Sequence, residues 1–145
     1  MRDMLASWIF WALLSAGFAA LTAIFAKVGI SNVNSDFATF IRTIVILVTI
    51  AFILTATGQW QPFGTVSPKS YAFLVLSGFA TGASWLCYFR ALKLGAAARV
   101  APIDKLSVVL VAVFGVVFLS EKLSAKNWLG VLLIASGAIL VAMRS

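Results

Sequence analysis

The chain has 145 residues, of which 63% are apolar and 10% are charged, and its formal net charge is +7. Soluble domains have about a quarter of their residues charged, so this composition excludes an ordinary water-soluble fold and indicates an integral membrane protein. With no histidine, one cysteine and four acidic residues, the chain lacks the groups that metal centres and acid–base catalysis require. We therefore expect no enzyme activity, no metal site and no cofactor.

The first predicted membrane helix covers residues 5–26 and is followed by Lys27 and a segment rich in turn-forming residues. Its uncharged stretch is longer than the roughly 7 to 15 apolar residues of a secretory signal, so we interpret it as a retained membrane helix. The second covers residues 37–57, close to the ~20 residues that cross a bilayer.

A connector with two prolines separates the second helix from the third, which covers residues 71–94. We expect Gly95 to end this helix as a left-handed C-cap. The fourth helix is predicted over residues 101–119, with Pro102 tolerated in its first turn and Asp104 at its positive N-terminal end. The fifth covers residues 128–143. The expected fold class is therefore all-α and integral to the membrane, with five transmembrane helices in a single domain spanning residues 1–145.

Five short motifs in the second half of the chain resemble one known family. They are YFRALKLG at 88–95, RVAPI at 99–103, SEKL at 120–123, WLG at 128–130 and SG at 136–137. Together they resemble the second half of an EamA-type domain, the repeat unit of the drug/metabolite transporter superfamily. Most familiar members carry two such units, whereas this chain carries one. The resemblance implies small-molecule transport across the cell inner membrane by a multi-pass protein.

The related small multidrug resistance proteins exchange protons for cationic drugs through a Glu in the first span. The first predicted span here contains no acidic residue. That coupling chemistry is therefore not carried over to this chain.

Aromatic and hydroxyl side chains recur every three or four residues on one face of the first helix and again on the third. Either these faces line a cavity for solute or the aromatic rings contact lipid. We favour the cavity because lipid offers the hydroxyl groups no partner beyond their own backbone. The candidate solute contacts from these two faces are Trp8, Trp11, Ser15, Phe18, Thr22, Ser77, Thr81, Trp85 and Tyr88.

Arg42 is the charged residue that lies well inside a predicted span. A charge at mid-bilayer costs ~2.5 to 3.5 kcal/mol on insertion scales, so Arg42 should snorkel or find a partner. The second and fourth helices begin on the same membrane side, which makes Asp104 a candidate partner, and we include both residues among the candidate solute contacts. The alternative is structural, with Asp104 offsetting nearby basic residues without touching solute.

We predict a secondary transporter or exporter of a small amphipathic metabolite or drug-like solute that works by alternating access. The alternative is a non-transporting half-size subunit, or a component of a lipid-carrier flippase, that needs a partner chain. The expected partners are membrane lipid, a small-molecule solute and a second copy of the chain. The dispersed Lys and Arg residues favour lipid headgroups over nucleic acid.

The expected working unit is a homodimer whose chains have opposite orientations, because one unit supplies only half of an inverted-repeat site. Orientation follows the Lys and Arg bias of the connectors, and this bias is nearly even. The side of the N-terminus carries Arg2, Lys69, Lys122 and Lys126. The other side carries Lys27, Arg90, Lys93, Arg99 and Arg144, with Arg42 and Lys105 close to it. The near balance predicts dual topology, whereas counting Arg42 and Lys105 with the second side favours a single orientation with the C-terminus in the cytoplasm. Small residues of the last helix are candidates for the dimer contact.

Overall fold

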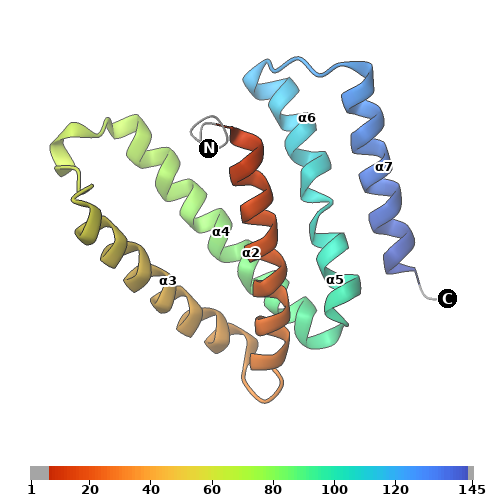
Figure 1. The fold of residues 1–145 in the computed structure, drawn as a ribbon, viewed down its shortest axis with the longest axis horizontal. Helices are drawn as coiled ribbons and strands as arrows, with labels where there is room; N and C mark the ends of the chain where they lie inside the picture. The colour runs from red at the N-terminus through yellow and green to blue at the C-terminus, as the bar shows by residue number, and fades with distance from the viewer. Residues whose placement is uncertain (1–6, 144–145) are drawn as a thin grey trace. The chain divides into compact units, whose positions relative to one another are not determined.

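The structure, a computed structural model, describes residues 7–143, and every regular element in that range is helical (Figure 1). The elements in chain order are α2 (Trp8–Gly29), α3 (Ser35–Thr57), the short 3₁₀ helix η1 (Phe63–Thr65), α4 (Pro68–Leu94), α5 (Ala97–Asp104), α6 (Ser107–Leu119) and α7 (Ala125–Ala142). The predicted all-α fold is confirmed.

Five of these stretches are long and apolar enough to cross a membrane, with α5 and α6 together forming the fourth. The five predicted spans are therefore confirmed, with boundaries displaced by a few residues. Large apolar side chains such as Phe52 and Phe79 are more than 70% exposed on the isolated chain. Lipid tails, not water, are the solvent that makes such exposure favourable.

The chain divides into two compact units, residues 28–93 and the remainder. The 28–93 unit contains α3 and α4, which are antiparallel and joined by a connector that includes η1. Gly58 ends α3 in the left-handed conformation, with φ of 65°, and its N–H donates to the carbonyl oxygens of Leu54 and Thr55. Gly is suited to this position because it has no Cβ to clash.

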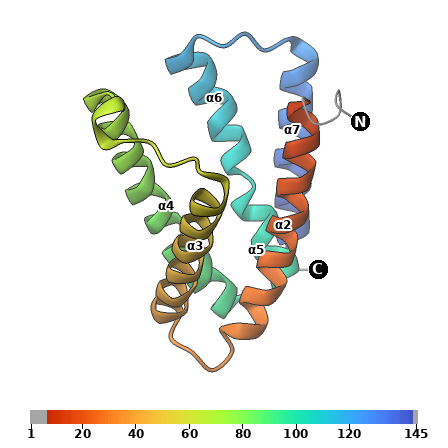
Figure 2. The same cartoon turned by 60° about the vertical axis from the view of Figure 1, so that its left-hand side comes forward.

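The other unit contains α2 up to Lys27, together with α5, α6 and α7. Helix α7 packs along both α5 and α6 (Figure 2). Its less exposed residues recur at three- and four-residue steps, which places them on one face of the helix. They are Trp128, Val131, Ala135, Ala138 and Ala142, with Gly130 the one further less exposed residue of the helix, and we call the face of these five residues the α7 stripe. Small side chains allow helices to approach closely in a membrane.

Two predictions about the fourth span are wrong. Helix α5 begins at Ala97, so Pro102 lies inside the helix and not in its first turn. Asp104 is consequently the last residue of α5 and not near its positive N-terminal end. The reason is local, because the alanines that precede Arg99 are strong helix formers and start the helix early.

The predicted left-handed cap at Gly95 is also wrong. Among residues 7–143, only Gly58 and Ser120 have positive φ. The Gly95 carbonyl instead accepts a hydrogen bond from the Lys27 Nζ atom at 2.7 Å. This bond gives a carbonyl group just beyond the end of α4 a side-chain partner.

The fourth span is interrupted at residues 105 and 106, between α5 and α6. At this break the backbone N–H groups of Leu106, Val108 and Val109 each donate to the carbonyl group three residues earlier, at 3.0 Å. This is the tighter 3₁₀ pattern, which often marks a hinge within a helix.

Candidate functional site

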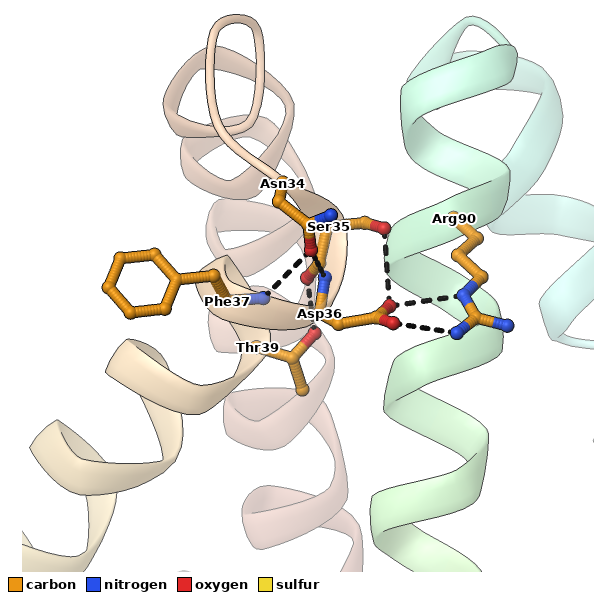
Figure 3. A network of polar contacts seen from close by, with 6 residues as sticks. All are labelled: Asn34, Ser35, Asp36, Phe37, Thr39 and Arg90. Atoms are coloured by element: carbon orange, nitrogen blue, oxygen red, sulfur yellow. Dashed lines mark hydrogen bonds and ion pairs between the residues drawn. The ribbon is translucent and has the colours of Figure 1, made fainter.

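The start of α3 and the end of α4 are joined by a charged contact (Figure 3). Arg90 donates from Nε to Asp36 Oδ1 at 3.0 Å and from Nη2 to Asp36 Oδ2 at 2.7 Å. One turn further along α4, Lys93 Nζ donates to the Val33 carbonyl oxygen at 2.8 Å. The fork of the guanidinium matches the two carboxylate oxygens, which makes this the most specific form of surface ion pair.

Asn34 positions Asp36 by capping α3. Its side-chain oxygen accepts hydrogen bonds from the backbone N–H groups of Asp36 at 2.9 Å and of Phe37 at 3.2 Å. The Ser35 hydroxyl donates to Asp36 Oδ1 at 3.3 Å. Asn is a preferred N-cap because its short side chain can satisfy orphan donors of the first turn. Local capping therefore sets the position from which Asp36 meets α4.

Deeper in the same unit, Arg42 packs over the aromatic side chains of α4. Its guanidinium carbon lies 4.3 Å from the centre of the Trp85 ring and 5.4 Å from that of Phe89. Both distances are within the range of cation–π attraction. Tyr88 is close enough to interact electrostatically with Arg42. We call Arg42, Trp85, Tyr88 and Phe89 the Arg42 cluster.

The charged pair and the Arg42 cluster share one helix register. Arg42 follows Asp36 by six residues, about 9 Å along α3, and Trp85 precedes Arg90 by five residues, about 7.5 Å along α4. Antiparallel helices in constant register bring both pairs together. The cluster therefore lies roughly two turns inward from the charged helix ends.

The structure brings together three of the predicted solute contacts, Arg42, Trp85 and Tyr88. Ser77 and Thr81 lie earlier in α4, before Trp85, and are exposed, and the Thr81 hydroxyl donates to the Ser77 carbonyl oxygen at 2.9 Å. This back-bond is the usual way for a hydroxyl to be satisfied within a membrane helix.

The candidate face of α2 is largely uncovered on this chain. Trp8, Trp11, Ser15 and Phe18 are exposed, and Thr22 is half-buried. On the opposite face, Ala23 is buried. The role of this aromatic face in lining a cavity remains a prediction.

Asp104 lies beside Lys105, with 3.5 Å between its Oδ2 atom and Nζ. Arg42 and Asp104 belong to different units of the chain. The pairing of Arg42 with Asp104 therefore stays a prediction. In the structure Arg42 contacts Trp85, and Asp104 lies beside Lys105.

Sequence reasoning missed Phe89, Asp36 and Arg90. Phe89 follows Trp85 by one helical turn, so the same spacing rule that selected Trp85 also places Phe89 on that face. Asp36 was not singled out by the sequence, and Arg90 was considered only for the charge bias of the connectors. Counting residues inward from the start of α3 and from the end of α4 would have placed Asp36 and Arg90 at neighbouring levels of the antiparallel pair.

The profile of the EamA-like transporter family matches residues 6–143, which is nearly the whole chain. The chain belongs to the EamA-like transporter family. A protein of Sinorhizobium sp. described as "Uncharacterized transporter in cobO 3'region" is 68% identical over 137 residues, a stretch that covers 94% of this chain and 97% of that protein. No solved structure matches the chain. The family and this relative identify a multi-pass membrane protein of a transporter family, as the sequence motifs indicate.

Proposed function

We propose that the protein is a secondary transporter or exporter of a small amphipathic solute in the cell inner membrane and that it works by alternating access. The observation that carries this proposal is the Arg42 cluster, a guanidinium held against aromatic rings inside a membrane-spanning pair of helices. Ionisable residues at such depth are rare and usually mark a solute or ion pathway. Aromatic area combined with a few polar groups suits a solute that is both apolar and polar.

The proposed moving part is the break between α5 and α6. Alternating access requires one element to change its angle around a fixed site. The 3₁₀ hydrogen bonds at Leu106, Val108 and Val109 lie in the middle of the fourth span, where a hinge would let the two halves tilt separately. The ion pair of Asp36 with Arg90 would then hold the α3 and α4 ends together on one membrane side.

We further propose an antiparallel homodimer as the working unit. The match to this chain covers 97% of the Sinorhizobium relative's own length, so that relative has the size of one unit. Sites in transporters of this kind form between two inverted repeats, and two unfused copies can supply them. Ser136 and Gly137 of α7 are exposed, away from the α7 stripe, which leaves small residues available for a second chain.

Flux through reconstituted protein tests the transport proposal. The purified chain would first be screened for solutes that raise its melting temperature, and the hits would be followed by uptake into proteoliposomes. We expect saturable uptake that depends on the protein. A chain that gives no flux alone but gains flux with another membrane protein from the same cell would instead indicate the half-size subunit.

Orientation is tested separately from flux. The C-terminus would be fused to one reporter that is active only inside the cell and, in a second strain, to one that is active only outside. Comparable signals from both fusions are expected for dual insertion. A signal from one fusion alone would contradict the antiparallel homodimer and leave the transport proposal standing.

A further inference from the structure

The Arg42 guanidinium contacts aromatic rings, but its N–H donors have no hydrogen-bond acceptor within the 28–93 unit. The guanidinium carbon lies 4.3 Å from the centre of the Trp85 ring and 5.4 Å from that of Phe89. These rings attract the charge but accept none of the conventional hydrogen bonds that its five N–H donors can make. Within its own unit, residues 28–93, Arg42 donates no hydrogen bond and forms no ion pair, and it is half-buried. A buried or half-buried guanidinium without an acceptor is unfavourable.

Asp36, the acidic residue nearest to Arg42 in the sequence, pairs with Arg90 and not with Arg42. Both oxygens of the Asp36 carboxylate are held by Arg90, at 3.0 and 2.7 Å. Asp36 is the only acidic residue between residues 28 and 93. This unit of the chain therefore presents a fixed positive charge, two helical turns inside the bilayer-spanning region, with no acid of its own to neutralise it.

We propose that the Arg42 cluster binds the anionic group of an amphipathic ligand, a carboxylate or a phosphate joined to an apolar body. This inference rests on the proposed transport function and specifies the class of its substrate. The guanidinium fork matches the paired oxygens of a carboxylate or phosphate, and Trp85, Tyr88 and Phe89 supply apolar area beside it. The same positive charge repels organic cations, so the cluster is unsuited to cationic drugs.

This ligand chemistry is shared by a soluble organic anion and by the phosphate of a lipid. A soluble anion would make the protein a carrier of an amphipathic acid. A lipid phosphate would make it a component that handles a lipid carrier. The test therefore contains one arm for each source.

The soluble arm compares three probes that differ only in their polar group. The protein, in a maltoside detergent free of phospholipid, would be melted with 4-phenylbutyrate, 4-phenylbutyramide and 4-phenylbutylamine. We expect the acid to stabilise the protein, with at least tenfold tighter apparent binding than the amide and no effect from the amine. The lipid arm compares phosphatidic acid with diacylglycerol in mixed micelles, and stabilisation by phosphatidic acid alone would assign the site to lipid phosphate.

Variants then locate the binding site of whichever anion stabilises the protein. Arg42→Gln should weaken that binding at least tenfold, and Arg42→Lys should weaken it less, because an ammonium keeps the charge but loses the flat fork. Lys69→Gln is the matched control, since it removes one positive charge from the first turn of α4 at the other end of the helix, and it should bind as the wild type does.

Several results would overturn the proposal. These are stabilisation by the amide or the amine as strong as by the acid, no stabilisation by either anion, or wild-type binding by Arg42→Gln. The comparison of probes on the wild-type protein decides the ligand charge even if Arg42→Gln does not fold. Saturable flux of a neutral or cationic solute that survives in Arg42→Gln would refute the anion site and leave the transporter proposal intact.

Discussion

The α3–α4 pair and the α7 region solve the problem of helix association in two different ways. Between α3 and α4 the described contacts are polar and aromatic: the ion pair of Asp36 with Arg90, the bond from Lys93 to Val33, and the Arg42 cluster. Along α7 the contact with α5 and α6 runs over small and apolar side chains of the α7 stripe. In a membrane, close approach of small residues holds helices together without the cost of burying charge.

This difference indicates which region is built for stability and which for chemistry. Charged groups inside a span are expensive and are kept where they interact with a ligand or a moving partner. Small residues in close packing offer no charge for a ligand and contribute mainly to helix association. We therefore expect substitutions in α7 to change folding and substitutions in the Arg42 cluster to change binding and flux.

The largest effect on stability should follow from Ala138→Phe. Ala138 is 7% exposed in the α7 stripe, and a phenyl ring there would force α7 away from its neighbours. Overpacking of this kind costs ~1 to 3 kcal/mol. The free energy of unfolding would be measured by SDS titration in mixed micelles. Leu140→Phe on the exposed face of α7 is the control, and equal destabilisation by both variants would contradict the close-packing interpretation.

Trp85→Ala should reduce solute flux about tenfold, since a cation–π contact is worth ~0.5 to 2 kcal/mol and 1.4 kcal/mol corresponds to a factor of ten. Without the ring at 4.3 Å, Arg42 loses the surface that holds it in place. Initial uptake rates into proteoliposomes at matched protein content provide the measurement. Trp60→Ala, in the exposed connector after α3, is the control, and normal flux in Trp85→Ala would place the solute site elsewhere.

The five spans were predictable because hydropathy and length alone identify membrane helices. Their exact ends were not, since capping depends on contacts that the sequence does not specify. A glycine after the last helical residue favours a left-handed cap, yet Gly95 has no positive φ. Its carbonyl oxygen accepts a hydrogen bond from Lys27, 68 residues away. Pro102 looked like a first-turn residue because its φ suits that position, while the alanines before it extended the helix.

The candidate site was predictable in its residue types more than in its pairings. The cost of a charge in lipid singled out Arg42, and helical spacing singled out Trp85 and Tyr88. The sequence did not reveal that aromatic rings, and not an acid, would contact Arg42, because a cation can be stabilised by either. The pairing of Arg42 with Asp104 stays a prediction, which a double-mutant cycle with Arg42→Asp and Asp104→Arg would test.

A smaller effect is expected from breaking the charged pair at the α3 and α4 ends. Arg90 and Asp36 are 60% and 44% exposed, so solvent screening keeps their contribution to stability small even with two hydrogen bonds. A double-mutant cycle with Asp36→Asn and Arg90→Gln, followed by SDS titration, isolates the coupling energy. Zero coupling would mean that Lys93 and the Asn34 cap suffice to hold these helix ends.

The smallest effect should be a gain in stability from Ser120→Gly. Ser120 ends α6 with φ of 56°, and its N–H donates to the Gly115 carbonyl oxygen. The Glu121 N–H donates to the same oxygen at 3.0 Å, which completes the helix-ending motif. A residue with a Cβ pays ~1 to 2 kcal/mol in the left-handed region, and glycine avoids this cost but loses more entropy on folding, which offsets about half of it. The net gain in unfolding free energy should therefore be about 0.5 kcal/mol.

Ser124→Gly, which removes the hydroxyl that accepts from the Asn127 N–H at the start of α7, is the contrasting control and should destabilise the protein. Loss of stability in Ser120→Gly would show that the serine hydroxyl, and not the backbone geometry, is what this turn requires.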